Sequence, residues 1–311
     1  MIHFKQVSKH FAGKAVVRDL TLDIAQGEFT VLIGTSGSGK STTLKMINRL
    51  IEHDRGSITF AGEPIEKLRA QELRRRMGYA IQSIGLFPHW TVEENIATVP
   101  QLLKWPKNKI RDRVTELLEL LHLEPEQFRH RYPHQLSGGQ QQRVGVARAL
   151  AADPDVLLMD EPFGALDPVT RTALQQEIAR IHQLLGRTIV LVTHDIDEAL
   201  SLADRIVLLN EGQIVQQGTP LEMLTKPATP FVRDFFGRSD MGIKLLSLGL
   251  VSERVRRGQT AQGEPILASM TLREALSIFV ARHTQQLPVI DEQGQALGVL
   301  HFADLVAERE S

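Results

Sequence analysis

The hydrophobic pattern of this sequence changes repeatedly between two periods, one typical of strands and one typical of helices. Short runs of mostly apolar residues, which favour buried strands, lie at 29–33, 156–159 and 188–192. Residues 91–150 are mainly helical in pattern, and 171–185 carries an apolar stripe along one helical face: Leu174, Ile178, Ile181 and Leu185. Strands that alternate with helices predict a mostly parallel α/β sheet.

Shorter segments complete this pattern around the buried strands. Candidate strands at 2–4 and 16–17 precede the first buried run, and two or three more lie within 56–79. Residues 206–209 and 213–215 flank an Asn-Glu-Gly turn, which predicts a hairpin. Within the helical region, a second apolar stripe predicts a packed helix: Val114, Leu117, Leu118 and Leu121.

The character of the sequence changes after Gly237, which predicts two domains. We expect a first domain over 1–237, with a helical subdomain at about 90–150, then a linker at 238–244 and a second domain over 245–311. The second domain is small for an independent core, so we expect it to pack against something else.

Within the second domain, the pair Thr271 and Glu274 has the spacing of a capping box, which predicts the start of a helix. The expected buried face of this helix is Leu272, Leu276, Phe279 and Val280. Strands are expected at 287–290 and 296–300, with a turn between them and a short helix at 302–307. This order predicts a small α+β unit.

A glycine-rich loop follows the first buried run and carries the clearest chemistry in the chain. It matches the phosphate-binding pattern G-x-x-x-x-G-K-[ST] in full: Gly34, Thr35, Ser36, Gly37, Ser38, Gly39, Lys40, Ser41 and Thr42. The N–H groups of such a loop bind phosphate, Lys40 would reach the β- and γ-phosphates, and Ser41 would hold Mg²⁺. The alternative is a chance match in a flexible turn, but a strand pattern precedes the loop and a helical pattern follows it.

Polar residues follow other candidate strands as well, and ligands of α/β sheets bind at such strand ends. Asp160 can hold the Mg²⁺ shell and Glu161 can orient or activate the attacking water, whereas the alternative is a helix or turn start. His194 can contact a γ-phosphate or cap the next helix, and Gln82 could reach a metal ion or water. Gly34 also lies at the end of a candidate strand. The agreement of Gly34, Gln82, Asp160 and His194 is stronger evidence for one shared site than any of these residues alone.

Three other segments have both a functional and a plain interpretation. Phe11 could stack on a purine, but its spacing favours an ordinary core residue. The sequence Ser-Gly-Gly-Gln at 137–140 opens a helix, either as a second anion-binding surface or as a plain helix cap. The bulky apolar residues of 86–90 form either a packed loop or a docking surface.

The composition narrows the class of protein further. The chain has 311 residues, of which 42% are hydrophobic, so it can bury a large core, and its net charge of −1 gives no reason to expect nucleic acid as a partner. It contains no cysteine, which excludes disulfides and thiolate metal sites and fits an intracellular setting. The sequence shows neither a signal core nor a membrane-spanning run, so any membrane role is expected to come through a partner.

In this order and combination, the motifs of residues 1 to about 237 resemble the nucleotide-binding subunit of an ABC transporter. The resemblance implies a P-loop NTPase fold with a RecA-like core and a helical subdomain, ATPase activity, and the cofactors ATP and Mg²⁺. The matching motifs are the Walker A loop Gly34–Ser41, the Q-loop Gln82, the signature Leu136–Gln140, a Walker B segment ending at Asp160 and Glu161, the D-loop Ala165–Asp167 and the switch His194.

The same resemblance implies roles that spacing alone does not give. Two copies would form a head-to-tail homodimer around two ATP molecules, each held by the loop 34–42 of one subunit and by residues of the other: Ser137, Gly138, Gly139, Gln140 and Asp167. Phe11 would stack on adenine, Glu161 would polarise the attacking water, and His194 would steady the γ-phosphate. The Mg²⁺ ligands would be Ser41, Gln82 and Asp160.

The whole chain is similar to the ATPase subunits of bacterial osmoprotectant importers for glycine betaine, choline or carnitine, most closely over 80–89 and 164–168. This similarity implies a separate integral membrane permease and a periplasmic or lipid-anchored solute-binding protein. It places the chain on the cytoplasmic face of the inner (plasma) membrane as a peripheral subunit, with no nucleic acid as partner. Residues 83–95 would pass the motion of the ATPase to the permease and Gln82 would contact it.

Residues 245–311 resemble a CBS module, a regulatory unit typical of this subgroup. One repeat is clear at about 264–309, whereas a working module pairs two, and 245–257 would be a degenerate remnant of the other. The usual Gly-x-x-Thr-x-x-Asp pattern keeps its acid as Asp304 but has His301 in place of the hydroxyl residue. Adenine-nucleotide binding and a pure dimerisation or packing role therefore both stay open.

Other functions are considered alongside the osmoprotectant importer. An importer ATPase could carry another small solute, such as an amino acid, but the CBS-like tail favours an osmoprotectant. A non-transport ABC ATPase could act on nucleic acid or ribosomes, although such proteins usually carry tandem cassettes or long coiled coils. A nucleotide sensor without turnover is disfavoured by the presence of both Glu161 and His194.

Overall fold

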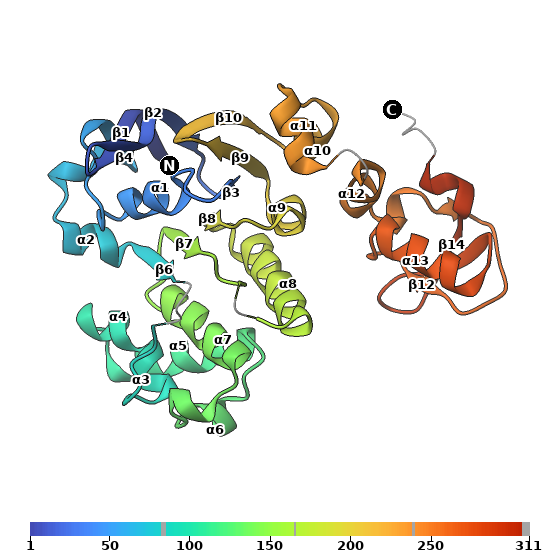
Figure 1. Ribbon diagram of the computed structural model, residues 1–311. Helices are drawn as coiled ribbons and strands as arrows, with labels where there is room; N and C mark the ends of the chain where they lie inside the picture. Colours follow the sequence, from blue (N-terminus) through green and yellow to red (C-terminus); the bar gives the residue numbers. More distant parts are fainter. Residues whose placement is uncertain (82–84, 165, 238–239, 307–311) are drawn as a thin grey trace. The chain divides into compact units, whose positions relative to one another are not determined.

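The computed structural model (Figure 1) describes residues 1–81, 85–164, 166–237 and 240–306. The chain divides into two compact units, Met1–Gln217 and Gly218–Ser311, each with an apolar core. The domain boundary expected after residue 237 stays a prediction. In the expected linker, residues 241–244 are helical and begin α12 (Met241–Leu248), because apolar side chains recur there at helical spacing.

The larger unit is built on a six-stranded sheet in the order β10-β9-β3-β8-β7-β6. Its strands are β3 (Phe29–Gly34), β6 (Met77–Ala80), β7 (Val156–Asp160), β8 (Thr188–Val192), β9 (Arg205–Asn210) and β10 (Gln213–Gly218). The strands from β9 to β6 pair in parallel, which confirms the predicted sheet, and β9 and β10 are neighbours, as the predicted hairpin requires. β3, β7 and β8 are buried along their full length, which is typical of parallel strands covered on both faces.

A second, antiparallel sheet holds the N-terminal residues, in the order β2-β1-β4-β5. Its strands are β1 (Ile2–Phe11), β2 (Lys14–Ile24), β4 (Arg55–Phe60) and β5 (Glu63–Pro64). β1 and β2 run well beyond the candidates at 2–4 and 16–17, because β1 pairs with β2 as far as Phe11 and with β4 as far as Ser8. Leu44 of α1 (Lys40–Ile47) and Val190 belong to the core that this sheet shares with the central sheet.

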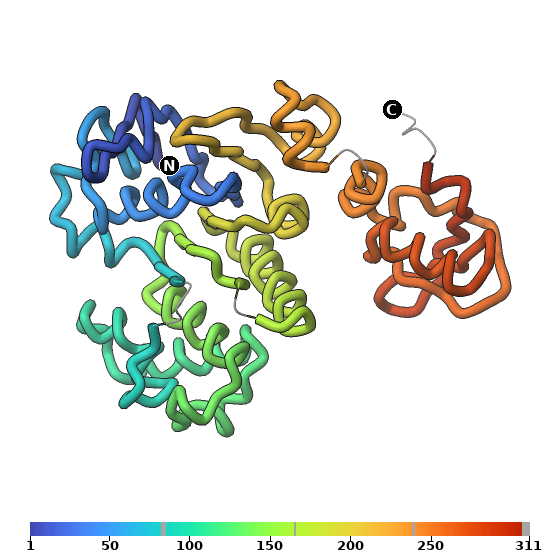
Figure 2. Tube along the Cα trace, viewed as in Figure 1, coloured from blue at the N-terminus to red at the C-terminus, as the bar shows by residue number. Residues whose placement is uncertain are grey.

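Figure 2 shows the chain leaving the central sheet after β6, forming a group of helices and returning at β7. These helices are α3 (Val92–Ile96), α4 (Thr98–Leu102), α5 (Lys107–Leu120), α6 (Pro125–Phe128) and α7 (Gly138–Leu150). The predicted stripe along α5 is buried in full: Val114, Leu117, Leu118 and Leu121. α7 lies so close to β6 that a Cβ atom on Gly78 would come within 2.3 Å of the carbonyl oxygen of Ala149.

Three more helices connect strands of the larger unit: α2 (Ala70–Arg75), α8 (Pro168–Leu185) and α9 (Ile196–Leu202). Of the predicted stripe on α8, Leu174, Ile178 and Ile181 are buried, but Leu185 is 42% exposed. Leu185 belongs to the predicted stripe but is exposed because α8 ends there, and the left-handed Gly186 turns the chain away. Across the described ranges, we find no helix that combines the length and the apolar character needed to span a membrane.

The smaller unit has a four-stranded sheet in the order β11-β14-β13-β12. Its elements, besides α12, are α10 (Pro220–Thr225), α11 (Pro230–Phe236), the 3₁₀ turn η3 (Val251–Glu253), β11 (Arg256–Arg257), β12 (Ile266–Leu267), α13 (Leu272–Arg282), β13 (Gln286–Ile290), β14 (Ala296–His301) and the 3₁₀ turn η4 (Phe302–Leu305). The predicted capping box at Thr271 and Glu274 begins α13, and Phe279 is buried. Val280, expected on the same face, is 61% exposed because it lies a further 100° around the helix from Phe279.

Candidate active site

The glycine-rich loop joins β3 to α1 and turns sharply at three glycines. Gly34, Gly37 and Gly39 have φ angles of 155°, 75° and 95°, in the region that favours glycine. The loop is also crowded, since a Cβ atom on Gly34 would lie 1.9 Å from the carbonyl oxygen of Leu209. A Cβ atom on Gly39 would lie 2.7 Å from the carbonyl oxygen of Val16. The predicted phosphate-binding loop therefore has the backbone that its sequence pattern requires.

Lys40 is the first residue of α1 and lies buried under the loop. Its Nζ donates to the carbonyl oxygens of Gly34 and Thr35, at 2.9 and 2.8 Å. Burial lowers the pKa of Lys40, and the negative charges of Glu161 and Asp160 oppose that effect. The ammonium group is thus held at the loop, and the charges of the two acids at the end of β7 act on it.

Asp160 is the last residue of β7 and faces α1 through both carboxylate oxygens. Its Oδ1 accepts a hydrogen bond from Ser41 Oγ at 2.7 Å, and its Oδ2 lies 3.4 Å from Lys45 Nζ. Burial and the charge of Asp160 together raise the pKa of Tyr79, which lies on the adjacent strand β6. These contacts bring together two of the three residues predicted to hold Mg²⁺.

Glu161 and His194 face each other beside the loop. Glu161 has a φ of 48°, and its N–H donates to the carbonyl oxygen of Val192 at 2.9 Å. Its Oε2 lies 3.4 Å from Nδ1 of His194. Both residues line a cavity of about 370 Å³ together with Val16, Ser36, Gly37, Ser38, Gly39, Lys40, Ser41 and Thr42. The phosphate loop and the two residues predicted to be catalytic therefore share one cavity.

Ser41 and Asp160 suit Mg²⁺, which prefers oxygen ligands and is usually held by one or two protein groups together with substrate phosphates and water. Their oxygen atoms are 2.7 Å apart, so a single ion could contact both. Among the described residues, no group of three or more His, Asp or Glu side chains is placed to hold a metal ion by itself. Gln82, the third predicted ligand, lies outside the described residues.

Phe11 does not belong to the hydrophobic core, so the plain interpretation of its spacing was wrong. It is the last residue of β1, and its side chain is 45% exposed. Lys9 Nζ lies 5.3 Å from the centroid of its ring. Phe11 is not among the residues that line the cavity, and its role as an adenine-stacking residue stays a prediction.

The signature residues lie at the start of α7 and also do not line the cavity of their own chain. Ser137 Oγ accepts from the N–H of Gln140 at 3.3 Å, and Gln140 Oε1 accepts from the N–H of Ser137 at 3.0 Å. Gly138 and Gly139 form the first turn of the helix. Asp167 similarly caps α8, where its Oδ1 accepts from the N–H of Thr170 at 3.0 Å. These segments are ordinary helix caps within one chain, and their roles toward a second chain stay predictions.

Two residues of the site were not predicted from the sequence. Lys45 contacts Asp160 because it lies four residues after Ser41, on the same face of α1, and that spacing was available as a signal. Val16 reaches the loop from the antiparallel sheet, and its sequence neighbourhood gave no signal because only the fold brings β2 beside Gly39.

In the smaller unit, the residues of the CBS-like pattern contact one another and β11. The guanidinium of Arg256 donates to both carboxylate oxygens of Asp304, at 2.9 and 2.6 Å, and lowers the pKa of that acid. His301 Nε2 lies 2.7 Å from Gln259 Oε1. A Cβ atom on Gly298 would lie 2.3 Å from the carbonyl oxygen of Arg256. The predicted acid is present, but it is already paired within the unit.

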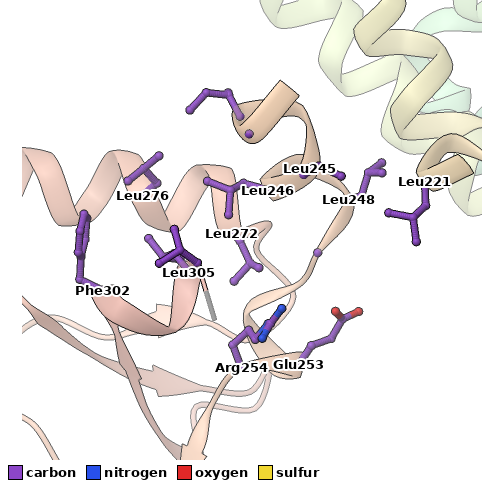
Figure 3. Close-up of a pocket in the computed structure, with 14 residues that line it drawn as sticks. Leu221, Leu245, Leu246, Leu248, Glu253, Arg254, Leu272, Leu276, Phe302 and Leu305 are labelled. Atoms are coloured by element: carbon purple, nitrogen blue, oxygen red, sulfur yellow. The ribbon is translucent and has the colours of Figure 1, made fainter. Parts of the chain in front are cut away.

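The smaller unit also contains a larger cavity, of about 830 Å³, which Figure 3 shows. Its walls come from α12, α13 and η4 and are mostly apolar, with side chains such as Leu246, Leu272 and Phe302. Glu253 and Arg254 are the charged residues that line it. It has no glycine loop and no pair of acids, so it does not compete with the cavity beside Lys40 as a site for phosphate chemistry.

A buried lysine under a glycine loop, a hydroxyl and a carboxylate suited to Mg²⁺, and a second carboxylate beside a histidine define one class of site. They are the parts of a P-loop nucleotide hydrolase.

Comparisons with known proteins agree with this class and narrow it. The family model for ABC transporters matches residues 17–164, and the model for the CBS domain matches 265–311. The chain is 68% identical over 308 residues to the glycine betaine uptake system ATP-binding protein YehX of Escherichia coli K12. This alignment covers 99% of this chain and 100% of that protein. It is 50% identical over 299 residues to the glycine betaine/carnitine/choline transport ATP-binding protein OpuCA of Bacillus subtilis. This second alignment covers 96% of this chain and 77% of that protein.

Among solved structures, the chain resembles the ATP-binding cassette MJ0796 in a dimeric, post-hydrolysis state bound to ADP and Pi. The TM-score is 0.64 at 34% identity, over 71% of this chain and 99% of the other. This chain therefore belongs to the ABC transporter family of ATP-binding proteins, and it is an ATPase.

Proposed function

We propose that this chain hydrolyses ATP to drive the uptake of a quaternary ammonium osmoprotectant, such as glycine betaine or choline, through a separate permease. The observation that carries the proposal is the glycine betaine uptake protein of Escherichia coli, whose whole length aligns with this chain at 68% identity. The intact catalytic cavity supports the ATPase part of the proposal, and the CBS match at 265–311 supports the assignment to this subgroup.

ATP is held by its phosphates in this account. The N–H groups of the loop 34–42 and the Lys40 ammonium bind the β- and γ-phosphates, and the N-terminus of α1 adds positive potential. Ser41, Asp160 and Gln82 hold Mg²⁺, which neutralises charge that develops on the transferred phosphate. Phe11 stacks on the adenine ring from the end of β1.

Hydrolysis requires a water molecule oriented in line with the γ-phosphate. Glu161 accepts a proton from that water, and the backbone turn at this residue directs its carboxylate toward His194 rather than along the strand. His194, whose ring lies beside Glu161, steadies the γ-phosphate by a hydrogen bond. The positive charge of the Lys40 ammonium offsets the negative charge of the β- and γ-phosphates.

The active form is a homodimer with two ATP molecules at its interface. Residues 137–140 and Asp167 of one subunit complete the site of the other, which explains why they do not line the cavity of their own chain. The first turn of α7 offers N–H groups to an anion, and Ser137 sits at its cap. The dimeric state of MJ0796, which is 34% identical to this chain, supports this arrangement.

The chain acts as a peripheral subunit on the cytoplasmic face of the inner membrane. It works with integral membrane permease subunits, to which a periplasmic or lipid-anchored binding protein delivers the solute. The loop after β6 contacts the permease, and its exposed aromatic pair Phe87 and Trp90, with ring centroids 4.6 Å apart, supports this role. In the smaller unit, the pairing of Asp304 with Arg256 favours a packing role over adenine-nucleotide binding.

The proposal is tested by purifying the chain from its own host membranes with a mild detergent. We expect ATPase activity in the membrane fraction and integral membrane permease subunits that copurify with the chain. An ATPase that is recovered without membrane proteins and that loses activity after nuclease treatment would instead support a non-transport ABC protein. A permease that stimulates turnover with an amino acid but not with a quaternary ammonium solute would replace the proposed substrate class.

A further inference from the structure

His194 has little around it that could fix its orientation. Its side chain is 68% exposed, and its contact within the described part of the chain is the one at 3.4 Å to Glu161. With so few contacts of its own, the His194 ring can be placed precisely only if the backbone that carries it is held on both sides. Its two neighbours in the chain, Thr193 and Asp195, are both held by side chains from helices.

Thr193 is fixed from α9 by a buried acid. Its Oγ1 donates to Oε2 of Glu198, which is only 5% exposed, and accepts from the N–H of Asp195 at 3.0 Å. The other carboxylate oxygen of Glu198 accepts from Gln175 Nε2 of α8 at 3.2 Å. Burial raises the pKa of Glu198, and the hydrogen bond from Thr193 opposes that effect. A buried acid with both oxygen atoms occupied is a firm anchor for the residue before His194.

Asp195 is fixed from α8 by an arginine. Its Oδ2 lies 3.7 Å from Nη1 of Arg171, while its Oδ1 caps α9. Nη2 of the same arginine donates to the carbonyl oxygen of Leu166 at 3.3 Å. Arg171 therefore joins the segment that follows Glu161 to the segment that carries His194.

We propose that Glu198, acting through Thr193, and Arg171, acting through Asp195, are positioning residues that hold His194 opposite Glu161 during hydrolysis. The inference rests on the proposed ATPase mechanism, and it adds residues that do not touch the substrate. Precise placement of a catalytic side chain affects the rate of the chemical step, whereas the binding of ATP depends on the loop and on Lys40. The proposal therefore predicts a loss in kcat with little change in KM.

The direct test is Thr193→Val in the full-length chain, because valine keeps the shape of threonine and removes only the hydroxyl group. We expect kcat for ATP to fall about tenfold and KM to change less than about twofold. Thr193→Ser, which restores the hydroxyl group, should return kcat close to the wild-type value. Unchanged kcat in Thr193→Val would overturn the proposal.

A matched control separates positioning from general stability. Thr188 lies at the other end of β8, is equally buried, and accepts a hydrogen bond from the N–H of Gly27 at 2.9 Å. Thr188→Val should lower the melting temperature about as much as Thr193→Val does, but leave kcat within about twofold of wild type. If both variants lose kcat in proportion to their melting temperatures, Thr193 has a structural role only and the proposal is wrong.

A double-mutant cycle tests whether the effect passes through His194. In a His194→Ala background, Thr193→Val should cost less than about twofold more in kcat, because the residue that it positions is already missing. A second tenfold loss would show that Thr193 acts independently of His194 and would overturn the proposal.

Arg171→Met keeps the proposal testable if the threonine variant does not fold. We expect a similar loss in kcat with unchanged KM, while Arg180→Met, which removes a more exposed arginine of the same helix, should leave kcat unchanged. Equal rates for the two arginine variants would contradict the inference while leaving the proposed function in place. A wild-type chain without ATPase activity would instead contradict both.

Discussion

Glu161 occupies a backbone conformation that acidic residues rarely adopt. Its φ of 48° places it in the left-handed region directly after the fully buried strand β7. The hydrogen bond from its N–H to Val192 holds this turn against β8, the strand that leads to His194. Local strain of this kind persists where surrounding structure fixes it, and here it brings a carboxylate within 3.4 Å of a histidine.

The residue-scale prediction concerns this carboxylate. Glu161→Gln keeps the shape of the side chain but removes the base, so the rate of phosphate release should fall about a hundredfold or more. ATP should still bind, because the loop and Lys40 are unchanged, and the ATP-bound dimer should persist long enough to be seen by sedimentation. Glu119→Gln on the exposed face of α5 is the matched control. Turnover near the wild-type rate would show that Glu161 is not the catalytic base.

Residues that belong to a sequence motif or follow a strand could be predicted for this site, and residues that only the packing of other elements brings there could not. The loop 34–42 follows from its pattern, and Asp160 with His194 follows from the rule that strand ends meet at one edge of a sheet. Val16 and Glu198 gave no such signal. The role of Val16 depends on where β2 crosses the loop, and the role of Glu198 depends on how deeply α9 is buried. The spacing of residues along the sequence predicts neither feature.

At the scale of elements, the contact of α7 with β6 connects the signature segment to the central sheet. Gly78 permits this contact, because a side chain there would collide with the backbone of Ala149 near the end of α7. The collision involves a backbone carbonyl, which cannot rotate aside as a flexible side chain could. The close approach therefore helps to fix the helix whose first turn carries Ser137.

Gly78→Ala should consequently destabilise the larger unit. Overpacking of this kind costs about 1–3 kcal/mol, so the free energy of unfolding measured with urea should fall by that amount. Gly242→Ala in α12 is the control, because an added Cβ atom meets nothing within 4 Å there and alanine favours helix over glycine. A Gly78→Ala variant as stable as wild type would show that β6 and α7 can separate freely.

Element prediction succeeded where periodicity was long and failed near element ends. The stripe on α5 is buried in full, but Leu185 and Val280 are exposed. Leu185 lies at the last residue of α8, where no further turn continues the face. Val280 is apolar and lies within α13, but its angle around the axis places it beside the buried face rather than on it.

At the scale of the whole molecule, each of the two units has its own apolar core. The larger core includes Leu32, next to the phosphate loop, and Val192, next to the segment that carries His194. The smaller core is formed by residues such as Phe279 and Leu300. The catalytic cavity draws all of its lining residues from the larger unit.

Deleting residues 240–311 should therefore leave basal ATPase activity within about twofold of the full-length value, because every residue that lines the cavity remains. ATP affinity and phosphate release, measured on the purified truncated chain, check this expectation. We expect the truncation to change only how the ATPase is regulated or how the subunit assembles. A truncated chain that cannot bind ATP would show that the predicted domain boundary is wrong.

The central claim, that this ATPase drives the import of an osmoprotectant, is tested most directly by uptake of labelled glycine betaine. Cells that lack the native gene would carry either the wild-type chain or Glu161→Gln, at low and at high osmolarity, with labelled histidine as the control solute. We predict that betaine uptake is lost in the Glu161→Gln cells alone and that histidine uptake is the same in both. Equal betaine uptake in the two strains would contradict the osmoprotectant assignment.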